Sequence, residues 1–248
     1  MGEEKSAKKL YDFMAEEYHN HRTKKYPSGW FYNELLEMPA MLDVLGNVKE
    51  KKILDMGCGS GIYAKILTKK GALVKGFDIS PTMLEIARKD NPKLELREGS
   101  AYKIPFNEKF DIVLASLMVH YLNDWDKMFK EVSKVLDKGG LFLFSTGNPV
   151  AECRDKIKYK GRKLRIFGDY FGTKKIVNYW KRQNGKKVKI VSFHKTYELI
   201  INTIVKNGFE IVEYKDTFPL KKAKKLFPEE YRLCSKVPFF TVWKLEKK

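Results

Sequence analysis

The sequence predicts an α/β protein built around one doubly wound, mostly parallel sheet. From residue 51 onward, short apolar runs typical of buried strands alternate with amphipathic helical patterns, and this alternation is the signature of βα units. The first apolar run, ILDM at 53–56, leads directly into three glycines at alternating positions, Gly57, Gly59 and Gly61. A glycine turn after a buried strand commonly forms a nucleotide-binding corner in such sheets.

The helices and strands up to the fifth strand are predicted from hydrophobic periodicity and from residues that typically begin or end helices. Before the alternation begins, two helices are expected, at 4–20 and at 30–45, with a turn at 26–29 between them and Gly46 as the C-cap of the second. The expected strands are 51–57, 73–79, 94–99, 110–116 and 141–146. The helices between them are expected at 62–71, 80–90 and 124–140. In the helix at 80–90, Ser80 is the N-cap and Pro81 takes the first helical position.

After the fifth strand the regular alternation of strand and helix patterns is interrupted. Residues 148–192 are aromatic, basic and punctuated by glycine, with short strands expected near 163–167 and 186–192. The alternation then resumes with a helix at 195–209 and strands at 210–218 and 239–247, so the interruption is interpreted as an insertion. We therefore expect one domain over 1–248, with a helical cap at 1–46 and a lid-like insertion at 148–192.

Composition narrows the class of protein and its partners. The hydrophobic fraction of 43% suits a globular domain with a real core, and no apolar run is long enough for a membrane span. The three cysteines, Cys58, Cys153 and Cys234, are odd in number and widely spaced, which favours a reduced, cytoplasmic setting. The net charge of +18 leaves RNA open as a partner, although the lysines are spread along the chain and are dense only at 156–165 and 181–189.

The glycine turn distinguishes between two kinds of nucleotide ligand. A dinucleotide turn reads G-x-G-x-x-G, whereas this one reads G-x-G-x-G and has Ile62 at the place of the late glycine. Asp55, at the end of the strand, would repel a pyrophosphate but suits a ligand with an ammonium group and a sulfonium. Asp78 follows 23 positions later, where such sheets present a carboxylate to ribose hydroxyls. The spacing of the glycines therefore disfavours a nicotinamide oxidoreductase.

Five segments together resemble a known family. They are ILDMGCGSG (53–61), GFDIS (76–80), GSAYKIPF (99–106), FDIVLASLMVHYL (110–122) and LDKGGLFLFST (136–146). In this order and spacing they resemble class I S-adenosylmethionine-dependent methyltransferases, most nearly the type-11, small-molecule-like branch, and the flanking segments resemble an uncharacterised subgroup of it. The resemblance implies a Rossmann-like, seven-stranded sheet with the last strand antiparallel. It also implies methyl transfer from S-adenosyl-L-methionine, with S-adenosyl-L-homocysteine as the product.

The resemblance also implies a set of cofactor-binding residues. Around the methionine part these would be Asp55, Gly57, Cys58, Gly59 and Gly61. Asp78 would hold the ribose, with Ile79 and Met83 against the adenine and Ser116 and Leu117 under the sulfonium. Ser100 and Ala101 stand where the family usually has an acidic residue beside an apolar one. Tyr11 and Tyr18 match tyrosines that often cover the cofactor; the alternative is that they are core aromatics of an amphipathic helix.

Methyl transfer mainly requires in-line placement of the nucleophile, so a catalytic side chain is not obligatory. Two histidines are candidate bases: His120, just after the fourth strand, and His194, where the insertion rejoins the sheet. Each also fits a structural role. His19 and His21 lie two apart with no third ligand at suitable spacing, so no metal site is expected.

The insertion contributes aromatic residues that suit either a planar or apolar acceptor or simple packing of the lid: Tyr159, Phe167, Tyr170, Phe171, Tyr179 and Trp180. The leading interpretation is a methyltransferase acting on an O, N or C nucleophile of a small molecule. A tRNA or rRNA methyltransferase and a non-catalytic S-adenosylmethionine-binding protein remain alternatives. Against enzymes that methylate exocyclic base nitrogens, residues 116–119 read SLMV rather than an NPPY-like stretch. No oligomeric state follows from the sequence.

Overall fold

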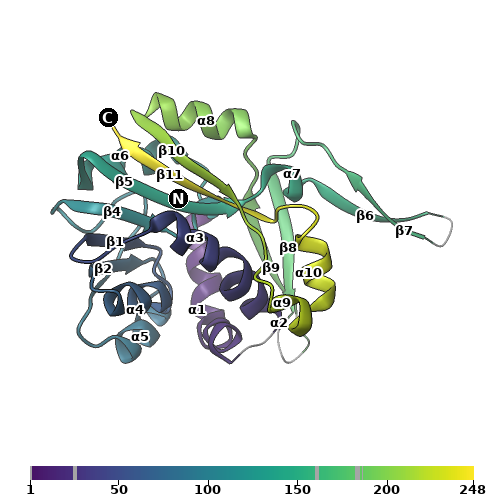
Figure 1. Ribbon diagram of the computed structural model, residues 1–248, viewed down its shortest axis with the longest axis horizontal. Helices are drawn as coiled ribbons and strands as arrows, with labels where there is room; N and C mark the ends of the chain where they lie inside the picture. The colour runs from purple at the N-terminus through teal and green to yellow at the C-terminus, as the bar shows by residue number, and fades with distance from the viewer. Residues whose placement is uncertain (1, 25–26, 160–161, 182–184, 186) are drawn as a thin grey trace.

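The computed structural model describes residues 2–24, 27–159, 162–181, 185 and 187–248, and in 27–28, 154–159, 162–167 and 181 it describes the backbone only. Its centre is a seven-stranded sheet in the order β10-β11-β5-β4-β1-β2-β3 (Figure 1). The strands are β1 (Lys52–Met56), β2 (Leu73–Asp78), β3 (Glu95–Glu98), β4 (Phe110–Ala115), β5 (Leu136–Gly147), β10 (Phe209–Asp216) and β11 (Phe240–Lys247).

The pairing within the sheet confirms the predicted fold class. Strands β1 to β5 pair in parallel, and β11 is antiparallel to both of its neighbours, β5 and β10. The strand order reverses between β1 and β4, because the chain runs from β1 to β2 and β3 on one side and then returns to β4 on the other. Open α/β sheets bind ligands beyond the carboxyl ends of the strands at such a reversal.

Helices cover both faces of the sheet because successive side chains of each strand point to opposite sides. Ile53 belongs to a core cluster with α3 (Met38–Leu45) and α4 (Ile62–Lys69). Its neighbour Leu54 belongs to another cluster, with α6 (Trp125–Val135) and α8 (Tyr197–Lys206). At the edge, α5 (Pro81–Asp90) packs Leu84 and Ala87 against Leu96 of β3.

The N-terminal segment forms a helical layer. The first helix, α1 (Gly2–Thr23), contains the expected 4–20, and the stretch 30–45 is helical as expected, with π-helical geometry in η1 (Phe31–Glu37) before α3. The turn expected at 26–29 is wrong at its described positions, because Pro27–Trp30 form the short helix α2, with proline at a helix start. Residues 25–26 lie outside the described residues.

The expected helix at 124–140 was too long. Helix α6 ends at Val135, and β5 begins at Leu136, whose partner is Phe110 of β4. Leu136 is fully buried, so its sheet contact outweighs the helical pattern of the sequence. Between 216 and β11 the structure adds two short helices that the sequence did not predict, α9 (Ala223–Leu226) and α10 (Pro228–Cys234).

The segment after β5 begins with the short helix α7 (Pro149–Glu152) and continues as two antiparallel hairpins. They are β6 (Arg154–Tyr159) with β7 (Arg162–Phe167), and β8 (Lys175–Lys181) with β9 (Lys187–Phe193). The two expected short strands correspond to β7 and β9, while their partners β6 and β8 were not predicted. Hairpin β6–β7 projects from the body of the protein, whereas β8–β9 lies against it (Figure 1).

Candidate functional site

The turn after β1 depends on its glycines. Gly57 and Gly61 have φ angles of 71° and 77°, which other residues rarely adopt. A Cβ at Gly57 would lie 2.9 Å from Met118 Cγ, and one at Gly61 would lie 2.7 Å from the amide nitrogen of Asn91. The backbone amides of Gly57 and Cys58 both donate to the carbonyl of Phe77 at 2.9 Å, which ties the turn to the end of β2.

Asp78, at the end of β2, organises the neighbouring backbone. One carboxylate oxygen accepts from the amide of Gly59 at 2.8 Å, and the other accepts from the amide of Ser80 at 2.9 Å. Burial raises the pKa of Asp78, while the hydrogen bonds from Ser80 and Gly59 oppose that rise. A carboxylate offers about four acceptor positions, so lone pairs remain for a ligand.

Ser80 continues this arrangement as the N-cap of α5. Its hydroxyl accepts from the amide of Met83 at 3.1 Å and donates to Asp12 of α1 at 2.6 Å. The capping role predicted from the sequence is confirmed, and the same hydroxyl joins α1 to the end of β2.

Asp55 is a buried carboxylate whose charge is poorly compensated. It is only 2% exposed, and burial, followed by the negative charge of Asp78, raises its pKa to about 7. The backbone amide of Ala64 opposes this rise, but the Oδ2 of Asp55 has no hydrogen-bond partner among the residues that the structure describes. An orphaned buried oxygen next to a ligand cavity is the kind of group that a bound cation would compensate.

A cavity lies at the carboxyl ends of β1, β2 and β4. Ten of the predicted cofactor residues line it: Tyr11, Tyr18, Gly57, Gly59, Asp78, Ile79, Met83, Ala101, Ser116 and Leu117. Four others, Asp55, Cys58, Gly61 and Ser100, are not among its lining residues. Leu117 adopts a φ of 46°, and such strained backbone is typical of functional sites.

Helix α1 forms one wall of the cavity and is held there by contacts along its length. The hydroxyl of Tyr11 donates to that of Tyr121 at 2.9 Å, and the rings of Tyr11 and Tyr18 meet edge to face at 5.7 Å. Ser100 donates to Glu4, which lines the cavity together with Ala101. Sequence reasoning missed Glu4 and Tyr121, because only the folded chain brings α1 over the strand ends.

Beneath the cavity lies a fully buried carboxylate, Glu37, at the end of η1. It accepts hydrogen bonds from Tyr63 at 2.8 Å, from Ser116 at 2.9 Å and from Ser145. Burial raises its pKa against these hydrogen bonds. Ser145 also accepts from the amide of Leu117 at 2.9 Å. Glu37 therefore fixes the end of β4, and sequence reasoning missed this residue too.

The two candidate histidines lie in different surroundings, and neither is among the lining residues of the cavity. His120, in the short helix η2 (Val119–Tyr121), has its ring 4.3 Å from that of Tyr121. Burial lowers the pKa of His120 to about 4, so its imidazole is neutral at physiological pH. Its Nδ1 has no hydrogen-bond partner within the described part of the chain.

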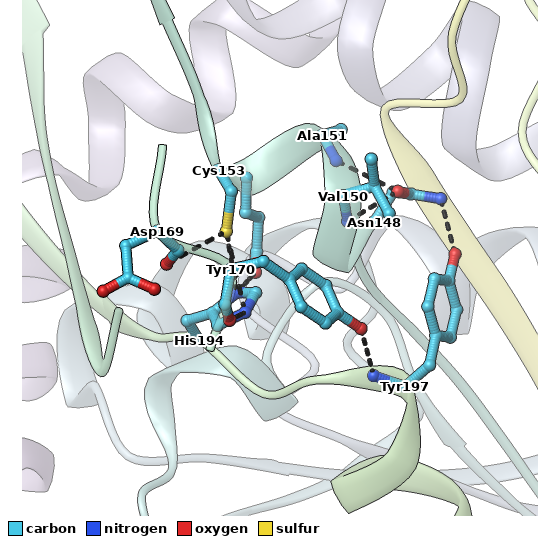
Figure 2. Close-up of polar contacts among 9 residues, drawn as sticks. Asn148, Val150, Ala151, Cys153, Asp169, Tyr170, His194 and Tyr197 are labelled. Carbon is cyan, nitrogen blue, oxygen red and sulfur yellow. Dashed lines mark hydrogen bonds and ion pairs between the residues drawn. The ribbon is translucent and has the colours of Figure 1, made fainter. Parts of the chain in front are cut away.

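His194 sits in a polar cluster between α7 and the end of β9 (Figure 2). Its Nδ1 lies 3.0 Å from a Glu152 oxygen, and its Nε2 lies 3.1 Å from the carbonyl of Tyr170. The thiol of Cys153 is 3.7 Å from the same ring. Both ring nitrogens thus have protein partners, so this geometry ties the segment after β5 together. A catalytic role for His120 or His194 stays a prediction.

Of the aromatic residues of the insertion, two pack against other side chains and two are largely exposed. Trp180 packs edge to face on Tyr18 of α1 at 5.5 Å, and Tyr170 contacts the His194 ring. Phe171 and Tyr179 are largely exposed, at 84% and 62%. The side chains of Tyr159 and Phe167, and those of the basic stretch 156–165, lie outside the described residues, as does part of 181–189.

Among the helices that the structure describes, none is both long and apolar enough to cross a membrane. The described residues contain no group of three or more histidine, cysteine, aspartate or glutamate side chains that could hold a metal ion. His19 instead lies 3.9 Å from Asp90, and the His21 ring contacts that of Trp180.

Comparison with known proteins places this geometry in context. The family model described as "Methyltransferase domain" matches residues 54–144. An uncharacterized protein of Haemophilus influenzae is 28% identical over 237 residues, covering 87% of this chain and 89% of that protein. A demethylmenaquinone methyltransferase of Chlorobaculum parvum is 44% identical over 94 residues, but the match spans only 37% of this chain and 39% of that enzyme. The crystal structure of an S-adenosylmethionine-dependent methyltransferase from Mesorhizobium loti superposes with a TM-score of 0.70 at 26% identity, covering 85% of this chain and 97% of the other.

Proposed function

We propose that the chain, an S-adenosylmethionine-dependent methyltransferase, methylates a small molecule held beside the cavity under α1. The observation that carries the proposal is the wall that α1 adds to the cavity, held by the Tyr11–Tyr121 hydroxyl pair and the Ser100–Glu4 contact. A concave site with such a wall suits a compact acceptor.

The residues of the cavity fit the methyl donor. When bound, S-adenosylmethionine supplies a methyl carbon activated by its sulfonium and takes the electron pair of the carbon–sulfur bond as the acceptor's nucleophile bonds to that carbon. Asp78 has acceptor positions left for ribose hydroxyls, and the orphaned oxygen of Asp55 supplies negative charge behind the glycine turn. Glu4 brings an acidic group next to Ala101, and we assign it to the adenine amino group in place of Ser100, whose hydroxyl is engaged.

The remaining roles concern the acceptor. Ser116 and Leu117 line the floor of the cavity, and Glu37 beneath them restricts how that floor can move. If the nucleophile must lose a proton, His120 is the better candidate base, since one of its ring nitrogens has no described partner, whereas both nitrogens of His194 have partners. We also propose that the insertion at 148–192 contributes to the acceptor's binding site.

One observation favours a second candidate, an RNA methyltransferase: the net charge of +18. Methyl-labelled S-adenosylmethionine should therefore be incubated with the protein and either a metabolite extract or total RNA from the source cells. Our proposal expects label in metabolites and none in RNA, and it expects the Asp78→Ala variant to transfer much less. Label found in RNA alone would overturn the proposal.

A further inference from the structure

A second hollow adjoins the cavity. It lies between the first turns of α1 and the hairpin β8–β9. Ala7 and Tyr121 line both spaces, so a molecule in the second hollow lies directly beside whatever fills the first. None of the donor-binding residues assigned above lines this second hollow.

The hairpin wall of this hollow combines positive charge with apolar surface. Lys175, Lys189, Val191 and Phe193 line it. Lys175 pairs with Phe193, and Lys189 pairs with Tyr179, four residues further along β8, so the two lysine backbones stand about 13 Å apart. Val191 and its partner Val177 lie between these pairs, and Val177 is 46% exposed. An apolar strip therefore runs between two lysines.

The opposite wall, from α1, carries one carboxylate among the lining residues. Glu3 accepts a hydrogen bond from the hydroxyl of Tyr102 at 3.3 Å, and a backbone hydrogen bond at the helix start lowers its pKa, so it is ionised. The lining residues thus present two ammonium groups and one carboxylate. Both lysines are exposed and have long, mobile side chains that can turn toward an anion.

Tyr121 supplies a hydrogen-bond donor at the boundary between the two spaces. Because Tyr11 donates its proton to the Tyr121 oxygen, the proton of Tyr121 itself is left for another acceptor. Burial raises the pKa of Tyr121 to about 12, which keeps the phenol protonated at neutral pH.

We propose that the second hollow binds the methyl acceptor, and that this acceptor is an elongated acid: a small molecule with a carboxylate, phosphate or sulfonate group joined to an apolar body. The acid group is held by Lys175 and Lys189, the body lies on Val191 and Phe193, and the reacting end meets Tyr121. The acid group is an anchor and is distinct from the nucleophile. This inference rests on the proposed function, because it names the substrate class of the same site.

The first test separates the metabolite extract before the reaction. An anion-exchange column at pH 8 divides it into a bound, acidic fraction and an unbound fraction of neutral and basic molecules, and each is incubated with methyl-labelled S-adenosylmethionine. We expect label only in the acidic fraction. Label only in the unbound fraction would overturn the acidic acceptor while leaving the proposed function intact. Label in neither fraction, with S-adenosylhomocysteine bound normally, would overturn the proposed function and this inference together.

The second test uses variants of the hairpin. The double variant Lys175→Met, Lys189→Met should raise the apparent KM for the acidic fraction at least about tenfold, since the loss of even one charge-assisted contact has an effect of that size. Its Kd for S-adenosylhomocysteine, measured by calorimetry, should not change. The matched control is Lys187→Met, which removes an exposed charge from the same strand outside the lining residues. An equal KM change in the control, or none in the double variant, would refute the assignment.

Discussion

Replacing Asp55 by asparagine should stabilise the ligand-free protein, and increasingly so as the pH rises. The carboxyl is 2% exposed and has a pKa of about 7, against an ordinary value of 3.8. Each pKa unit corresponds to about 1.4 kcal/mol, so the ionised carboxylate costs the folded state about 4 kcal/mol above pH 7. Between the two pKa values the cost is partial, at about 2 kcal/mol at pH 5.

The sign follows from proton binding. Because the folded-state pKa lies above the unfolded one, the folded chain retains the proton longer, and stability falls as the pH rises from about 4 to about 7. Asparagine cannot ionise, so the Asp55→Asn variant lacks this loss. Any cost of its own amide hydrogen bonding is independent of pH and cancels when two pH values are compared.

Urea unfolding of the ligand-free wild type and of Asp55→Asn at pH 5 and pH 8 measures this effect. The stability difference in favour of the variant should grow by about 2 kcal/mol between these pH values. The control is Asp137→Asn, at an exposed aspartate, for which no comparable growth is expected. A difference that does not change with pH for Asp55→Asn would refute the reasoning that burial without a full set of partners raises this pKa.

Three other substitutions test separate parts of the site. Asp78→Ala should weaken S-adenosylhomocysteine binding by about 1–3 kcal/mol in calorimetry through lost charge-assisted hydrogen bonds, and an unchanged Kd would contradict the ribose role. Gly57→Val should abolish that binding, because valine tolerates neither the φ of 71° nor the contact with Met118; normal binding by a folded variant would show that the turn is not needed. His194→Gln should lower the free energy of unfolding by about 1–3 kcal/mol and leave the Kd for S-adenosylhomocysteine unchanged. If the histidine is instead a base, turnover will be lost with stability unchanged.

The parts of the fold that sequence predicted well are those with local signals. The strands around the glycine turn, the N-cap at Ser80 and the positive φ at Gly46 all depend on residues within a few positions of one another. The boundary between α6 and β5 was misplaced because Leu136 pairs with Phe110, 26 positions earlier. Local helical preference carries no information about such a pairing.

The site was predicted in part for the same reason. Residues carried by motifs, such as Asp78 and Leu117, do line the cavity. Glu37 was missed because its partners Ser116 and Ser145 lie 79 and 108 positions away. Glu4 was missed because its relation to Ser100 exists only once α1 has packed over the strand ends. Only one strand of each hairpin was predicted, because the residue pattern of a strand does not indicate which segment pairs with it.

Thermal unfolding in the presence of each ligand tests most directly whether the G-x-G-x-G turn holds a methyl donor and not a dinucleotide. With S-adenosylhomocysteine at about 100 times its Kd, mass action should stabilise the protein by about 2.7 kcal/mol. For a chain of this length that shift corresponds to a Tm rise of about 5–10 °C. NAD at the same concentration should leave the Tm unchanged. A Tm raised by NAD and not by S-adenosylhomocysteine would contradict the assignment of the turn to a methyl donor.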